Sequence, residues 1–299
     1  MPNTLAHIGV NGISTRTVIK NPDLKWILLG TIIPDIPWML QRAAKIIYPE
    51  INGYDLRLYV IVQATLFFSL ILSFWFSQFS VNRLKTFFIL GAGSVLHLLL
   101  DATQKKWGNG VHFLAPFNWD LLNFGWYWPE SMVTYLITIA GLFYVFYYRK
   151  ELFFQKADFH LRNFAFHFIH FVVLLIYFLL PFYFMPNAET ADNHFVHTLR
   201  DYTNRTGKYI EFDRRKVFDD NGEFYLVTFA NENIKLKSDI KLNEGVYSIK
   251  GVFLAPETIR VKAFHKHNTL FRDGASYSGL LLIILAWVVP LWKRKIKPA

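Results

Sequence analysis

The chain has 299 residues, of which 53% are hydrophobic and only 18% are charged, and it contains 30 phenylalanines and no cysteine. An ordinary soluble domain is about 25% charged, so this balance favours a membrane protein. The absence of cysteine excludes disulfides, thiol nucleophiles and cysteine-based zinc sites. The net charge of +10 comes mainly from basic residues at the ends of apolar runs, which indicates cytoplasmic flanks of spanning helices rather than a nucleic-acid-binding surface.

Apolar runs, taken in chain order, predict about seven membrane-associated helices. Two weaker runs come first. Residues 4–19 are half polar, and residues 26–40 contain Pro34, Asp35 and Pro37, so both are candidates for short, broken or re-entrant segments. Each stronger run is close to the ~20 residues with which a helix crosses ~30 Å of hydrocarbon. The stronger runs cover residues 58–79, 84–100, 132–148, 164–184 and 276–292.

Basic residues between these runs predict the orientation of the chain. Connections rich in Lys and Arg stay in the cytoplasm. The N-terminus, residues 101–130 and residues 186–274 should then face outward, and the C-terminus should face the cytoplasm. The basic residues in question are Arg83, Lys85, Arg149, Lys150, Lys156, Arg162, Lys293, Arg294, Lys295 and Lys297.

Residues 187–273 differ in kind from the rest of the chain. After a helical start at 187–202, β-forming residues cluster at 209–212, 225–229, 246–253 and 259–264, with turn signals such as Asp220-Asn221-Gly222 between them. We therefore predict an α-helical membrane protein with a small all-β domain, OB-like as one candidate, inserted before the last span. The predicted organisation is a helical membrane domain over 1–186, an extracytoplasmic β-rich domain over 187–273, and a final transmembrane helix with a basic cytoplasmic tail over 274–299.

Four polar residues are expected at one depth near the outer ends of their segments. His97 and Asp101 are four residues apart and so share a helix face. Asp35 and His7 lie at the predicted outward ends of their own runs, and His112 follows in a loop. An ionisable residue in a membrane segment usually faces the bundle interior and marks a site. His and Asp are zinc ligands, so these residues are candidates for a metal site; the alternative is a His–Asp hydrogen bond that holds helices together.

These motifs carry a resemblance to a known family. The stretches MPNTLAHIGV, GTIIPDIP and HLLLDATQKKWGNG, within residues 1–150, resemble the predicted inner-membrane metal-dependent hydrolases of the LexA-regulated bacterial type, which are distantly similar to zinc-dependent phospholipase C. The resemblance implies a bacterial inner (cytoplasmic) membrane, a divalent metal with zinc as first choice, and His7, Asp35, His97 and Asp101 as its site. The chain departs from the family pattern at Pro37, where a second Asp is usual, and residues 54–69 contain no His, so Asp55 or His112 could be recruited instead.

Two functions remain open from the sequence. The first is a membrane-embedded metal-dependent hydrolase that acts on a lipid-borne phosphoester or ester at the outer face, with Asp35 or Asp101 accepting a proton from water. The second is a non-catalytic membrane protein with a degenerate metal site, whose β-domain binds an envelope protein partner. Both have the lipid bilayer as a partner, and neither involves nucleic acid.

Other polar groups have simpler interpretations. Pairs of histidines three or two residues apart are expected to bond to neighbouring helices or to lie on surfaces. A basic run in the β-domain is expected to be solvated, with anionic headgroups as the alternative. These groups are His167 and His170, His194 and His197, His265 and His267, and the run Arg214, Arg215 and Lys216.

Overall fold

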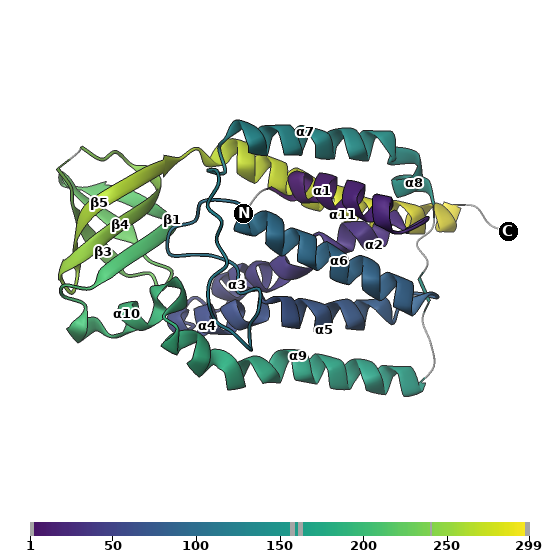
Figure 1. Ribbon diagram of the computed structural model, residues 1–299, viewed down its shortest axis with the longest axis horizontal. Helices are drawn as coiled ribbons and strands as arrows, with labels where there is room; N and C mark the ends of the chain where they lie inside the picture. Colours follow the sequence, from purple (N-terminus) through teal and green to yellow (C-terminus); the bar gives the residue numbers. More distant parts are fainter. Residues whose placement is uncertain (1–2, 156–158, 161–163, 240, 297–299) are drawn as a thin grey trace.

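The computed structural model describes residues 3–155, 159–160, 164–239 and 241–296. Helices run side by side along the long axis of the molecule, and a β-barrel sits at one end of them (Figure 1). The N-terminus lies at the barrel end of the helices, and the C-terminus lies at the far end. Lys156, Arg162 and Lys297, which the charge pattern assigns to the cytoplasm, lie outside the described residues.

The first two apolar runs form one helix and one broken segment. Helix α1 (Thr4–Val18) begins where the Asn3 side chain accepts a hydrogen bond from the amide of Ala6. The second run breaks into α2 (Leu24–Gly30), the 3₁₀ turn η1 (Ile33–Asp35) and α3 (Ile36–Ile47). Pro34 and Pro37 each lie at the start of an element, where proline is well tolerated because the missing N–H has no helical partner there.

The remaining helices include fewer membrane-spanning candidates than the sequence predicts. They are α4 (Gly53–Gln63), α5 (Leu66–Ser77), α6 (Arg83–Ala102), α7 (Met132–Tyr147), α8 (Arg149–Phe154), α9 (Phe164–Thr190) and α11 (Thr269–Ile296). Among the described residues only α6, α9 and α11 are long and apolar enough to cross a membrane. A fourth span results if α4 and α5, which meet at a bend of 68°, count as one.

The prediction of about seven spans is therefore wrong by count, for physical reasons. Helix α1 has 15 residues and α7 has 16, too short for ~30 Å of hydrocarbon at 1.5 Å per residue. The run at 58–79 is interrupted because Thr65 has extended backbone angles and caps α5 by accepting a hydrogen bond from the amide of Phe68. Large apolar side chains are nevertheless exposed along these helices, as lipid contact would require: Phe143, Phe171, Phe182 and Leu281.

Glycines let the central helices approach closely. A β-carbon at Gly141 of α7 would lie 2.0 Å from the carbonyl oxygen of Leu5 in α1, and Gly9 faces the same contact from the other side. Gly30 of α2 and Gly93 of α6 meet in the same way. Small residues at such positions allow helix backbones to pack against one another in membrane proteins. The site residues on α1 and α6 are therefore held by backbone contacts.

A short connector leads from α9 into the barrel. It consists of η2 (Asn193–Phe195), α10 (Val196–Arg200) and η3 (Tyr202–Asn204). The strands are β1 (Tyr209–Asp220), β2 (Glu223–Val227), β3 (Asn233–Lys237), β4 (Gly245–Ala255) and β5 (Thr258–His267). They close a barrel in the order β1-β2-β3-β5-β4, in which only β3 and β5 pair in parallel. The predicted small all-β domain before the last helix is thus present as a closed barrel, and a relationship to OB-folds stays a prediction.

The barrel rests on the connection between α6 and α7. The amide of Gly108 donates to Glu211 Oε2 at 2.6 Å, and Asn109 Nδ2 donates to Asp213 Oδ2 at 3.1 Å. Arg205, which precedes β1, is almost fully buried; it pairs with Glu232 at 2.8 Å and donates to the hydroxyl oxygen of Tyr54 in α4 at 3.3 Å. The barrel and the helices therefore meet through specific polar contacts, and the space between them is framed by both.

Candidate metal centre and the cavity beside it

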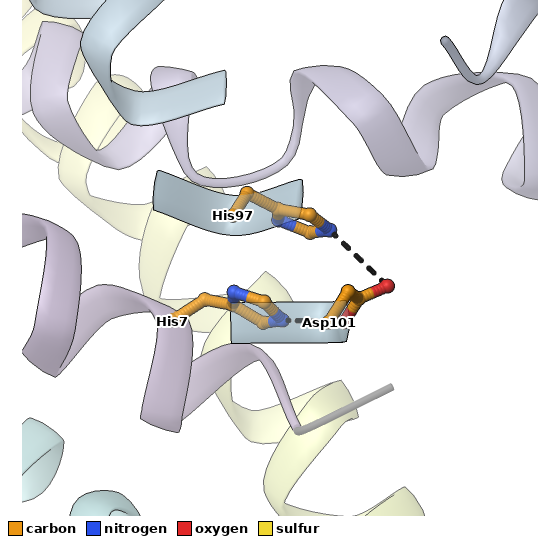
Figure 2. A group of neighbouring side chains, drawn as sticks. All are labelled: His7, His97 and Asp101. Atoms are coloured by element: carbon orange, nitrogen blue, oxygen red, sulfur yellow. Dashed lines mark ion pairs between the residues drawn. The ribbon is translucent and has the colours of Figure 1, made fainter. Parts of the chain in front are cut away.

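Three buried side chains meet at the barrel end of the helices. His7 comes from α1, and His97 and Asp101 come from successive turns of α6 (Figure 2). His7 Nε2 lies 3.4 Å from Asp101 Oδ1, and His97 Nε2 lies 4.0 Å from Asp101 Oδ2. The two imidazole rings are stacked with centroids 3.8 Å apart. Asp35, at the end of η1, approaches from the side, with its Oδ1 3.6 Å from His97 Nε2. The four residues singled out from the sequence thus gather at one place.

A backbone contact determines the form of His97. Its Nδ1 lies 2.6 Å from the carbonyl oxygen of Thr31. A carbonyl oxygen can only accept, so Nδ1 carries a proton and donates. In the neutral ring Nε2 then presents a lone pair, and it faces the carboxylates of Asp35 and Asp101. Acceptors facing acceptors without a cation between them are unfavourable, and a backbone bond of this kind is what orients a metal-binding imidazole.

The cluster contains an unusual number of unpartnered buried atoms. Among the described residues, no hydrogen-bond partner exists for five of its atoms: His7 Nδ1, His7 Nε2, His97 Nε2, Asp35 Oδ1 and Asp101 Oδ1. Native proteins leave few such atoms, and each needs an explanation. The spacings of 3.4 to 4.0 Å exceed the 2.7–3.2 Å of good hydrogen bonds, which counts against a simple His–Asp lock between helices.

The spacing suits a metal ion better. Two ligands at ~2.1 Å from a tetrahedral zinc ion lie ~3.4 Å apart. The pair His7–Asp101 has this separation, and His97–Asp35 is close to it at 3.6 Å. Asp101 is further oriented by Lys106, whose Nζ donates to Oδ2 at 3.1 Å. The residues present therefore fit a divalent cation, although their assignment as ligands stays a prediction.

The cluster opens on a cavity of about 510 Å³ between the helices and the barrel. His97, Asp101 and Lys106 form part of its wall, next to Pro34. The remaining wall comes from α3, α4, the α6–α7 connection, the barrel and the start of α11. Seven cationic side chains line the cavity against three carboxylates, an excess of four positive charges: Arg42, Lys45, Arg57, Lys106, Arg214, Arg215 and Arg272 against Asp101, Asp213 and Asp273.

His112, which the sequence offers as an additional ligand, lines the cavity, but in the described part of the chain it makes no hydrogen bond or ion pair with the cluster. Its Nδ1 accepts from Asn193 Nδ2 at 3.1 Å, so the neutral ring carries its proton on Nε2. Burial and the charge of Arg57 together lower the pKa of His112 to about 4, so the ring is neutral. In this form it offers the cavity a donor instead of a metal ligand.

Asp55, the other residue considered as a replacement ligand, lies away from the cluster. Its side chain is about half exposed and pairs with Arg200 at 2.5 Å. His194, expected on an exposed helix face, is instead buried, and Arg57 Nη2 donates to its Nδ1 at 2.7 Å. Burial lowers the pKa of His194 well below its usual value, and the nearby charges of Arg57, Arg215 and Lys106 act in the same direction. Both findings correct the sequence interpretation.

A bulge in β1 turns the basic run toward the cavity. The pairing of β1 with β4 shifts between Phe212 and Arg215, and Arg214 adopts a left-handed backbone with φ of 49°. In a regular strand adjacent side chains point to opposite faces, whereas a bulge re-aims one of them. Asp213, Arg214 and Arg215 consequently all line the cavity, and the expectation of a solvated charge run is wrong for the two arginines.

A second group of possible metal ligands joins β5 to the α6–α7 connection. His267 Nδ1 lies 2.8 Å from Glu130 Oε1, and His265 Nε2 lies 3.5 Å from Glu130 Oε2. His267 is buried, so the expected surface pair is wrong for this residue. Its Nε2 lies 2.8 Å from Ser248 Oγ, so both ring nitrogens already have partners. Only the strand positions of the histidines were visible in the sequence, because Glu130 is 137 residues away from His267.

No protein-family model, curated protein or solved structure matches this chain.

Proposed function

We propose that the protein is a membrane-embedded, metal-dependent hydrolase that acts on a lipid-borne phosphoester or ester at the outer face of a bacterial inner membrane. The observation that carries the proposal is the buried group of His7, His97 and Asp101, whose unpartnered atoms have metal-ligand spacing beside a large cavity. The apolar helices α6, α9 and α11 support the membrane setting. The N-terminus, the α6–α7 connection and the barrel lie at one end, which agrees with the orientation expected from charge (Figure 1).

Each polar group near the cluster has a definable role in such a reaction. A divalent cation, zinc in the first instance, would be held by His7, His97 and Asp101, and it would supply an activated water and charge stabilisation. The Asp35 carboxylate is partly exposed and has one unpartnered oxygen, so it is the group placed to accept a proton from water. Lys106 fixes the Asp101 carboxylate and lines the cavity where negative charge would develop.

The reaction consumes one water molecule. The water oxygen forms a bond to phosphorus or to the acyl carbon, and the bond to the leaving oxygen breaks. One water proton passes to Asp35 and then to the leaving oxygen, so that an alcohol and an acid are released. The carboxylate of Asp35 is regenerated at the end of the cycle.

Metal content tests the proposal directly. The detergent-purified protein should contain near-stoichiometric zinc or manganese by mass spectrometry, and His97→Ala and Asp101→Ala should each bind it more than tenfold more weakly. His170→Ala is the matched control, because it removes another buried imidazole, packed on Phe79 at 4.4 Å, far from the cluster in sequence. Lipid phosphoesters and esters in mixed micelles are then screened for turnover that depends on the metal.

The rival function gives a different result. A well-folded wild type that binds no metal, even after metal is added back, would overturn the hydrolase proposal. The cluster would then act as a polar contact between α1 and α6, and the barrel would be the part to test for an envelope protein partner. Pro37, which stands where the resembling family has a second Asp, is the feature of the sequence that favours this rival.

A further inference from the structure

The cavity wall carries several buried hydrogen-bond donors. Among the described residues that line it, no partner exists for Arg57 Nε, Arg214 Nη2 or His112 Nε2. His194 Nε2 is also unpartnered; its ring lies outside the lining, 5.9 Å from that of His112. His112 and His194 each accept at Nδ1, so their unpartnered nitrogens carry protons. Three orphaned buried donors in the lining predict an acceptor that binds there, since buried donors without partners are costly.

Three cations converge on a single aromatic residue in this wall. The guanidinium of Arg57 lies 5.4 Å from the centre of the Phe229 ring, and that of Arg215 lies 5.5 Å from it. Lys45 Nζ donates to the backbone carbonyl of the same phenylalanine. Arg57 also lies 4.5 Å above the ring of Trp38, which holds the guanidinium plane in place. Fixed guanidinium groups bind phosphoryl oxygens through paired N–H donors.

These cations lie close enough to repel one another. Burial lowers the pKa of Lys45, and the charges of Arg215 and Arg57 lower it further. Burial likewise lowers the pKa of Arg215, with Asp213 opposing the shift. Like charges are gathered here at a cost in stability that a bound anion would remove. A neutral carboxylic ester would leave that cost in place.

We propose that the cavity binds a terminal, doubly charged phosphoryl group, as in a phosphomonoester or a diphosphate, held by Arg57, Arg214 and Lys45 beside His97 and Asp101. The excess of four positive charges in the lining favours such a group over a neutral ester or a singly charged phosphodiester. As a substrate site this inference rests on the proposed function, and it narrows the substrate class to phosphoryl compounds. As a binding site it depends only on the cationic wall.

The test is anion binding to metal-free protein. Inorganic pyrophosphate and phosphate are titrated calorimetrically into EDTA-treated, detergent-purified protein, with acetate as a singly charged comparison. Pyrophosphate should bind most tightly and acetate at least tenfold more weakly, and the affinity should fall as salt rises. Arg57→Gln and Arg214→Gln should each raise the Kd for pyrophosphate at least tenfold. Arg214→Lys should raise it less, because lysine keeps the charge but not the planar fork.

Two controls separate this inference from the proposed function. Arg260→Gln removes the same charge from an exposed position on β5 and should leave the Kd within twofold. The double variant His97→Ala/Asp101→Ala loses the metal cluster but keeps the cationic wall, so pyrophosphate should still bind. Far-UV circular dichroism and size-exclusion chromatography check that each variant is folded. If Arg57→Gln does not fold, Arg214→Gln alone tests the anion site.

The proposed anion site is refuted if pyrophosphate binds no better than acetate. It is also refuted if Arg57→Gln and Arg214→Gln change the Kd for pyrophosphate no more than Arg260→Gln does. Competition identifies the source of the phosphoryl group. Displacement of pyrophosphate by phosphatidic acid in mixed micelles, but not by phosphatidylcholine, supports a lipid headgroup, whereas displacement by neither supports a free phosphate in the same site.

Discussion

The close contact between α1 and α7 provides a way to disturb the candidate metal site without replacing any of its side chains. In Gly141→Ala the new β-carbon would lie 2.0 Å from the carbonyl oxygen of Leu5, two residues before His7. A carbon–oxygen contact needs ~3.3 Å, so α1 must move by ~1.3 Å. Metal–ligand distances tolerate only about ±0.2 Å. The displacement should therefore carry His7 out of ligand range.

The expected cost in stability is smaller than the loss of metal. Alanine is favoured over glycine in a helix by ~1 kcal/mol, and overpacking costs ~1–3 kcal/mol. The net loss is ~0–2 kcal/mol, which corresponds to a lowering of Tm by at most about 8 °C. Metal affinity should fall at least tenfold, as measured by metal content after dialysis against graded chelator, while thermal unfolding in detergent gives Tm.

The matched control is Gly274→Ala in α11. A β-carbon at Gly274 meets nothing within 4 Å, so this change should leave metal binding intact and alter stability by less than ~1 kcal/mol. Gly141→Ala protein that retains wild-type metal affinity would refute the reasoning, because it would show either that α1 does not move or that His7 is not a ligand.

Two further predictions concern the contact between the barrel and the helices. Burial raises the pKa of Glu130, but the hydrogen bond from His267 and the charges of His267 and Arg214 together outweigh it, so the net pKa lies below the ordinary value of 4.5. The contribution of Glu130 to stability is therefore complete above pH 4.5 and is lost as the pH falls below that value. In thermal unfolding between about pH 7 and about pH 3.5, Glu130→Gln should therefore show less loss of stability on acidification than wild type, and equal slopes would contradict this. Arg205→Ala should lower the free energy of unfolding by ~1–3 kcal/mol, because it leaves two backbone carbonyls and Glu232 without their buried partner. Lys208→Ala breaks a partly exposed ion pair and should change the free energy of unfolding by less than ~1 kcal/mol. Similar losses in both variants would count against the role of burial.

Local spacing was enough to predict the centre of the site. His97 and Asp101 share a face because residues four apart lie on successive turns of any helix. Asp35 could be placed because Pro34 and Pro37 mark a break in an otherwise apolar run. These inferences needed no knowledge of which helices are neighbours.

The cationic wall could not be predicted in this way, because it depends on contacts between distant segments. Arg57 and His194 are 137 residues apart in the chain. Arg214 faces the cavity only because of a bulge whose position is set by pairing with β4, and the same three residues in an unbroken strand would alternate. The number of spans was also overestimated, since apolar composition alone does not reveal the bend between α4 and α5.

The two walls of the cavity, one from the helices and one from the barrel, are synthesised at different times. His7, Asp35, His97 and Asp101 all lie in the first 101 residues, together with Lys45 and Arg57, whereas Arg214 and Arg215 enter only with β1. A growing chain can thus complete the wall that carries the candidate metal ligands well before the barrel exists. On the proposed function, a nascent or truncated protein would carry its metal, Lys45 and Arg57 but would lack Arg214. Membrane phosphates would then bind less tightly to the unfinished protein until the barrel has folded back onto the helices.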